Sequence, residues 1–72
     1  MAISIKSEIA GVVDAIEKHE GDTVAEGDEV IILSSMKMEI PVVATASGRI
    51  GSIAVSTGET VTESQLLFTI ET

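Results

Sequence analysis

The chain of 72 residues contains no cysteine and only one histidine, His19. A disulfide framework is therefore excluded, and so is a zinc site built from cysteine and histidine ligands. Phe68 is the only aromatic residue, although 44% of the chain is hydrophobic. We therefore expect a core of valine, isoleucine, leucine and alanine, a composition that favours strands. A chain of this length has room for one small domain.

Basic residues are also scarce, with four lysines and arginines against twelve acidic residues and a formal net charge of -8. They are scattered, and no aromatic side chains are spaced to stack on bases, so no nucleic-acid partner is expected. The longest apolar run, Val30–Leu33, is far below the roughly 20 residues of a membrane span. The first residues lack the charged and apolar segments of a signal peptide. The sequence thus predicts a cytoplasmic protein without a membrane partner.

An internal repeat organises the sequence. A shift of 37 positions aligns residues 1–35 with residues 38–72 and leaves Met36 and Lys37 between the two copies. The identical pairs include Gly11 with Gly48, Ile16 with Ile53, Gly21 with Gly58, Thr23 with Thr60, Val24 with Val61 and Glu26 with Glu63. Two similar halves in one small core imply a pseudo-two-fold arrangement. The junction between the copies and the two chain ends should then lie at opposite positions.

Each copy reads as short strands separated by turns. Segments 29–34 and 66–71 are apolar enough to be buried strands, and no segment shows a sustained helical period. Glycine accepts positive φ and aspartate bonds its own backbone, so the Gly-Asp pairs at 21–22 and 27–28 indicate turns. The glycines predicted to be turn residues are Gly21, Gly27, Gly48 and Gly58. This pattern predicts an all-β sandwich or flattened barrel.

The junction between the copies is a candidate functional site. Apolar strands on both sides make Ser34–Val42 a hairpin with Met36 and Lys37 at or near its tip. Two-residue hairpin loops favour Asn-Gly or Asp-Gly, and positions where local preferences fail are often functional. Met36 and Met38 also offer soft, adaptable side chains to an enzyme that must recognise this surface.

Lys37 is best suited to be an attachment point. A catalytic lysine needs burial or neighbouring cations, and a hairpin tip offers neither. No second catalytic group accompanies it, because His19 stands alone in a loop and the carboxylates are spread over turns. An exposed amine on a flexible stem can instead accept a covalent group. The alternative is an ordinary turn lysine with the methionines packed on the end of the barrel.

Ser35-Met36-Lys37-Met38 resembles the biotin-attachment motif of the biotinyl/lipoyl domain family. The resemblance extends over essentially the whole chain through Gly21-Asp22-x-Val24-x-x-Gly27-Asp28 and, in the second copy, Gly48, Gly58-Glu59-x-Val61 and Gln65-Leu66. The segment 36–42 is most similar to small free-standing biotin carrier or attachment proteins. Methionine on both sides of the lysine distinguishes biotin carriers from lipoyl domains, which typically have aspartate before the lysine and a small residue after it.

The resemblance implies a flattened barrel, or barrel-sandwich hybrid, of two four-stranded sheets with Lys37 on an exposed hairpin far from both termini. It implies biotin as a covalent cofactor on Lys37, attached by a biotin protein ligase. The residues implied in ligase recognition are Met36, Met38, Ser35 and Glu39. Further implied partners are a biotin carboxylase and a carboxyltransferase, between which the biotin arm carries a carboxyl group, as in acetyl-CoA carboxylase. The domain would supply no catalytic residue and no metal, so it would be a carrier subunit and not an enzyme.

Two positions depart from the family pattern, which commonly has glutamate at Ser34 and glycine at Ser64. Lys6 and Lys18 are expected to be exposed and unmodified, because neither has flanking methionines. Two other functions remain open. One is a lipoyl carrier of a 2-oxo acid dehydrogenase, on the same fold with a different cofactor. The other is an unmodified barrel that acts as a protein-interaction module.

Overall fold

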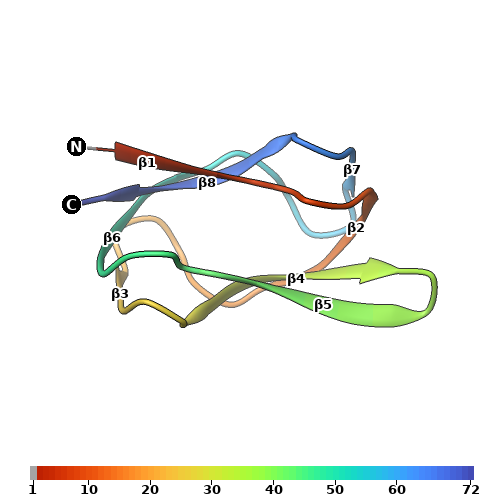
Figure 1. The fold of residues 1–72 in the computed structure, drawn as a ribbon, viewed down its shortest axis with the longest axis horizontal. Coiled ribbons are helices and arrows are strands. Elements are labelled where there is room, and N and C mark those ends of the chain that lie inside the picture. The colour runs from red at the N-terminus through yellow and green to blue at the C-terminus, as the bar shows by residue number, and fades with distance from the viewer. Residues whose placement is uncertain (1) are drawn as a thin grey trace.

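The computed structural model describes residues 2–72, and all regular secondary structure in this range is β-strand. The strands are β1 (Ala2–Lys6), β2 (Gly11–Ile16), β3 (Thr23–Val24), β4 (Glu29–Ser35), β5 (Met38–Val43), β6 (Gly48–Ile53), β7 (Thr60–Val61) and β8 (Leu66–Glu71). They form two antiparallel four-stranded sheets, ordered β1-β8-β6-β3 and β5-β4-β2-β7 (Figure 1). The predicted all-β flattened barrel is confirmed. The described residues contain no helix able to cross a membrane.

The two sheets are related by pseudo-two-fold symmetry. The strands of the first copy and those of the second occupy equivalent places in opposite sheets: β1 corresponds to β5, β2 to β6, β3 to β7 and β4 to β8. The backbone hydrogen bonds of the connections repeat with the same offset of 37 residues. Gly21 N donates to Ile50 O at 2.8 Å, and Gly58 N donates to Val13 O at 2.7 Å. Because each turn bonds to a strand of the other copy, neither copy satisfies its backbone groups alone.

The core lies between the two sheets. The largest fully buried side chains are Phe68, Ile31, Leu33, Ile50, Leu67, Ile70, Val13, Val30 and Val61. The expectation of a purely aliphatic core is therefore wrong at one position, because the only aromatic residue is 0% exposed at its centre. Phe68 lies on β8, a central strand, and pairs with Ile5 on one side and Ile53 on the other. A central strand has a neighbour on each edge, so its inward side chains are shielded best.

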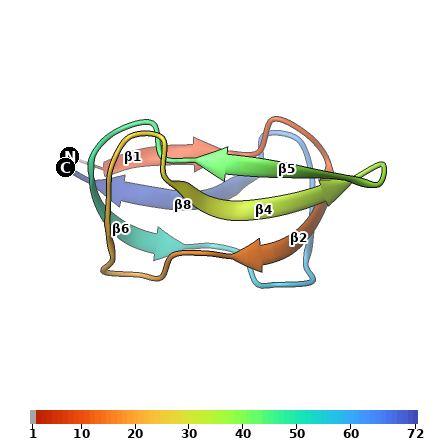
Figure 2. The ribbon, with the colours of Figure 1, turned by 90° about the horizontal axis from the view of Figure 1, so that it is seen from below.

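The β4–β5 hairpin extends from one end of the barrel, which measures 33 × 17 × 17 Å. Figures 1 and 2 show its tip at the end of the long axis opposite both chain termini. The terminal strands β1 and β8 form the equivalent pair in the other sheet. Ala2 pairs with Glu71, and their repeat counterparts Glu39 and Ser34 pair with each other near the hairpin tip. A segment joined to either terminus would therefore leave the barrel from the end that is far from the hairpin tip.

Gly27 and Ser64 occupy equivalent turns of the two copies, and both have positive φ, 94° and 71°. A side chain in this left-handed region costs about 1 kcal/mol, which glycine avoids. Ser64→Gly is therefore expected to raise the free energy of unfolding by about 0.5–1 kcal/mol, as measured by urea denaturation. The matched control is Gly27→Ser, expected to lower it by a similar amount. An added Cβ at position 27 meets no atom within 4 Å, so this exchange reports backbone conformation alone. Equal stability of Ser64→Gly and the parent would contradict the expectation.

Candidate functional site

The hairpin tip is a two-residue turn formed by Met36 and Lys37. Ser35 pairs with Met38 at the ends of β4 and β5, and the two residues between them have φ of 51° and 66°. Positive φ at both central positions is the signature of a type I′ turn, which normally contains Asn-Gly. Here both residues carry long side chains, and left-handed residues with a Cβ cost about 1 kcal/mol each. Such local strain is typical of functional positions.

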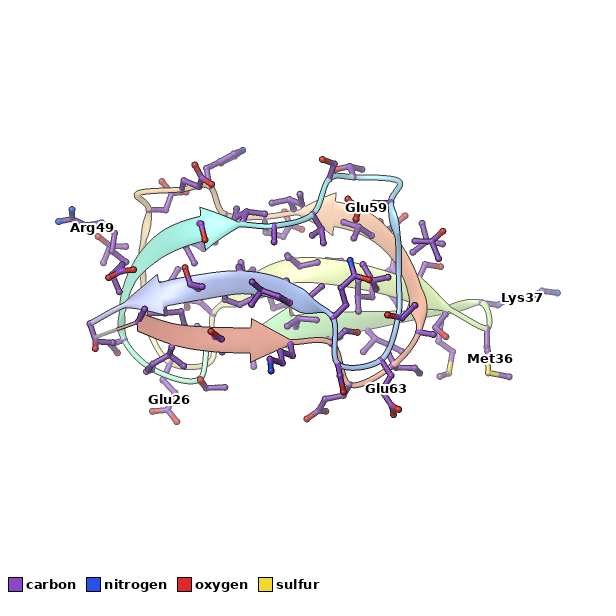
Figure 3. All side chains as sticks on the ribbon, turned by 90° about the horizontal axis from the view of Figure 1, so that it is seen from above. Glu26, Met36, Lys37, Arg49, Glu59 and Glu63 are labelled. Carbon is purple, nitrogen blue, oxygen red and sulfur yellow. The ribbon has the colours of Figure 1, made fainter. Side chains whose placement is uncertain are left out.

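The side chains around the tip are open to solvent. Met36 is 89% exposed and Met38 is 58% exposed, and Lys37 and Glu39 are exposed as well. Figure 3 shows Lys37 pointing away from the barrel along its long axis, with Met36 projecting beside it. The structure thus brings Ser35, Met36, Lys37, Met38 and Glu39 into one strand-turn-strand unit. The alternative that both methionines pack on the end of the barrel does not fit the exposure of Met36.

The amine of Lys37 is chemically available. Within residues 2–72, its Nζ has no hydrogen-bond or ion-pair partner, so acylation would break no structural contact. The described residues also place no three histidine, aspartate or glutamate side chains together as a metal-binding group. The tip therefore presents an exposed amine at the end of a two-stranded hairpin. This arrangement suits covalent attachment of a group to Lys37.

Gly11 supports the base of the hairpin. It begins β2, and a Cβ at this position would lie 2.7 Å from the carbonyl oxygen of Ser34 and 3.3 Å from Cβ of Ser35. Its repeat counterpart Gly48 begins β6, and a Cβ there would come even closer to the carbonyl oxygen of Glu71. The prediction of Gly48 as a turn residue is therefore wrong. Glycine is needed at both positions because two backbones approach closely.

Ser34 stands directly opposite Glu39 in the β4–β5 pair. A glutamate at position 34, common in the family that the motif resembles, would place two like charges across the strand pair, which is destabilising. Serine therefore accommodates Glu39 at the base of the tip. Of the other lysines, Lys6 is exposed as predicted, but Lys18 is half-buried and not exposed.

Met36→Asn is expected to raise the free energy of unfolding by about 0.5–1 kcal/mol, because asparagine tolerates the left-handed region better than methionine does. Met38→Asn is the matched control. It removes the other exposed methionine from a position that lies in β5 and has no positive φ. Met38→Asn should therefore not raise the free energy of unfolding. Thermal and urea unfolding of the two variants measure the difference. Destabilisation by Met36→Asn would contradict a strained turn.

The flattened barrel and the exposed Lys37 at its hairpin tip are typical of a small carrier domain. The chain belongs to the biotin/lipoyl attachment family, because the family model described as "Biotin-requiring enzyme" matches residues 1–70.

Two small proteins are similar to this chain over most of their own length. A biotinylated protein TB7.3 homolog from Mycobacterium leprae is 37% identical, covering 97% of this chain and 99% of that protein. A biotin/lipoyl attachment protein from Bacillus subtilis is 40% identical over 93% of this chain and 89% of its own length.

Among solved structures, urea carboxylase from Kluyveromyces lactis superimposes with a TM-score of 0.93 and 35% identity, over 99% of this chain but 6% of that one. A lipoyl domain from the 2-oxoglutarate dehydrogenase complex of Azotobacter vinelandii superimposes with a TM-score of 0.83 and 26% identity, over 97% and 96% of the two chains. The same fold therefore occurs in a segment of a carboxylase and in a lipoyl domain, so the fold alone does not distinguish a biotin carrier from a lipoyl carrier.

Proposed function

We propose that this chain is a biotin carrier, with biotin attached to Lys37 by a biotin protein ligase. The observation that carries the proposal is the unpartnered amine at the hairpin tip, between two exposed methionines. In the ATP-dependent reaction, ATP first activates the biotin carboxyl group as a mixed anhydride. The deprotonated Nζ then attacks the carbonyl carbon and displaces the phosphate-containing group, so the resulting amide carries no positive charge. Met36 and Met38 are the side chains best placed for the ligase to recognise, with Ser35 and Glu39 beside them.

The residues at the tip favour biotin over lipoic acid. Lipoyl domains typically have aspartate before the lysine and a small residue after it, whereas methionine occupies both positions here. The similar protein from Mycobacterium leprae is itself named as biotinylated. A lipoyl carrier remains the second candidate because its fold is the same.

The proposed role is to carry a carboxyl group between a biotin carboxylase and a carboxyltransferase. Segments similar to this chain make up 6% of the urea carboxylase and 9% of the human propionyl-CoA carboxylase alpha chain. A tethered group is presented to an active site at an effective concentration set by its linker. The barrel contributes a stiff support that holds Lys37 about one barrel length from the chain ends.

The carrier role is tested by transfer of labelled carboxyl groups. The biotinylated chain is incubated with a biotin carboxylase, ATP and radiolabelled bicarbonate, and the label on the protein is measured. We expect label on the biotinylated chain and none on the unmodified chain. A carboxylase that labels free biotin but never the biotinylated chain would refute the carboxylase role while leaving biotin attachment intact.

A further inference from the structure

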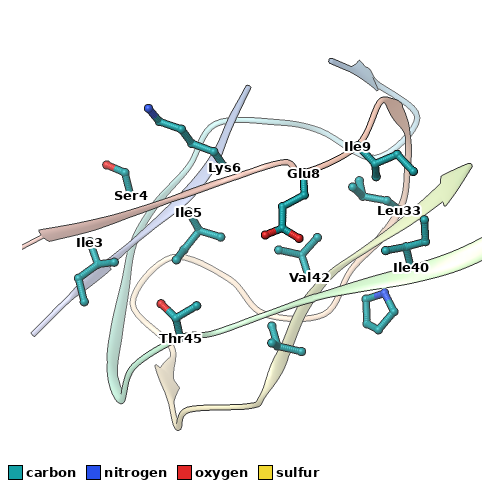
Figure 4. Close-up of a pocket in the computed structure, with 12 residues that line it drawn as sticks. Ile3, Ser4, Ile5, Lys6, Glu8, Ile9, Leu33, Ile40, Val42 and Thr45 are labelled. Carbon is teal, nitrogen blue, oxygen red and sulfur yellow. The ribbon is translucent and has the colours of Figure 1, made fainter. Parts of the chain in front are cut away.

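A groove of about 400 Å³ lies along the seam between β1 and β5, the edge strands of the two sheets (Figure 4). Its apolar lining comes mainly from Ile3, Ile5, Ile9, Leu33, Ile40 and Val42. The volume falls within the range of small-molecule sites, which are mostly apolar with a few polar groups that orient the ligand. β1 and β5 are not hydrogen-bonded to each other, so the seam is open where the two sheets meet.

One carboxylate is placed over this groove. Figure 4 shows the side chain of Glu8, from the β1–β2 loop, reaching over Val42. Glu8 is exposed, and no described residue donates a hydrogen bond to its carboxylate or pairs with it. The groove therefore combines apolar walls with a free carboxylate, and Ser4, Lys6 and Thr45 complete its polar lining. A complementary ligand has an apolar body and a polar end with an N–H donor.

The groove begins within reach of Lys37. Ile40 follows Lys37 by three residues on β5, and Val42 by five, which places their Cα atoms about 10 and 17 Å from that of Lys37 along an extended strand. A biotinyl-lysine side chain spans about 14 Å from Cα to the fused ring when extended, by standard bond lengths. When the Lys37 side chain turns back along β5, the fused ring can thus lie beside Ile40, with its ureido end directed toward Val42.

We propose that the biotinyl group on Lys37 docks in this groove, an inference that rests on the proposed function. The methylene chain and the fused ring pack against Ile40 and Val42, and one ureido N–H group donates a hydrogen bond to the carboxylate of Glu8. The two N–H bonds of a cyclic urea diverge on either side of its carbonyl, so the second N–H stays free for solvent. Tethering supplies an effective concentration on the order of 1 mM. An intrinsic dissociation constant on the order of 1 mM would then leave roughly half of the arms docked. Docking this weak holds the biotinyl arm against the domain when no partner enzyme is bound, and the arm leaves the groove readily when one binds.

The docking is tested by comparing backbone amide NMR spectra of the biotinylated and unmodified chains, after intact mass has shown the adduct. We expect shift changes at the tip and also at groove residues, chiefly Ile3 to Ile5, Glu8 and Ile40 to Val42. Lys37→Gln removes the lysine charge without adding an arm, so it identifies changes that follow from charge alone. Changes confined to residues 35–39 would overturn the docking and leave biotin attachment standing. Absence of any adduct would overturn both.

A second readout is the rate at which avidin captures the biotinylated chain. If half of the arms are docked, Glu8→Ala should raise this rate about two-fold, because only the undocked fraction can bind. Glu63→Ala is the matched control, since Glu63 is an exposed glutamate in the β7–β8 turn, outside the groove (Figure 3). Equal rates for the parent and both variants would overturn the role of Glu8.

Discussion

Lys37→Arg is expected to abolish biotin attachment completely while leaving the barrel folded. Acylation needs a primary amine, and a guanidinium group does not provide one, although it keeps the charge and the length of the side chain. Lys37 is exposed, and its Nζ has no partner within residues 2–72. The free energy of unfolding should therefore change by no more than about 0.5 kcal/mol.

Intact mass after co-expression with a biotin protein ligase measures the attachment, and urea unfolding measures the stability. Lys6 and Lys18 serve as internal controls, because both remain in the Lys37→Arg variant and neither is flanked by methionine. A biotin adduct on this variant would show that another amine is modified and would refute the assignment of the site.

Phe68→Ala is expected to lower the free energy of unfolding by about 3–5 kcal/mol, as for other buried aromatic residues. A domain of this length has a total stability of roughly 4–11 kcal/mol, so much of the population should unfold at moderate temperature. The reason is the position of Phe68, which is fully buried on β8 between Ile5 and Ile53. Truncation would leave a cavity that touches both neighbouring strands of the sheet.

Phe68→Ile is the matched variant, because the repeat counterpart of Phe68 is Ile31, which is also fully buried. We expect this substitution to cost about 1–2 kcal/mol, since it keeps most of the apolar volume. Circular dichroism during urea unfolding compares the two variants with the parent. A loss below about 1 kcal/mol for Phe68→Ala would contradict a core centred on this side chain.

Much of the fold was predictable because the sequence contains the same pattern of strands and turns in two copies. The apolar segment 66–71 coincides with β8, and the segment 29–34 falls one residue short of β4. The hairpin around Met36 and Lys37 was predictable from the strands on either side of it. The burial of Phe68 was not, because composition alone suggested an aliphatic core and could not place one aromatic residue between two sheets.

Other features depend on contacts that a linear pattern does not contain. Gly48 looked like a turn residue, but glycine also marks a close approach of two backbones, and only the pairing of β6 with β8 distinguishes the two uses. The positive φ of Met36 and Lys37 is imposed by the pairing of Ser35 with Met38 and opposes their own preferences. The groove joins residues 3–9 to residues 40–45, which meet only where the two sheets do.

The proposed function requires that Lys37 accept biotin and not lipoic acid. The most direct test offers the unmodified chain to a biotin protein ligase and a lipoate ligase in one mixture, with ATP and both cofactors. Intact mass then identifies the adduct, and peptide mass spectrometry locates it. We expect a single biotin adduct on Lys37. A lipoyl adduct, or biotin on any other residue, would contradict the proposed function.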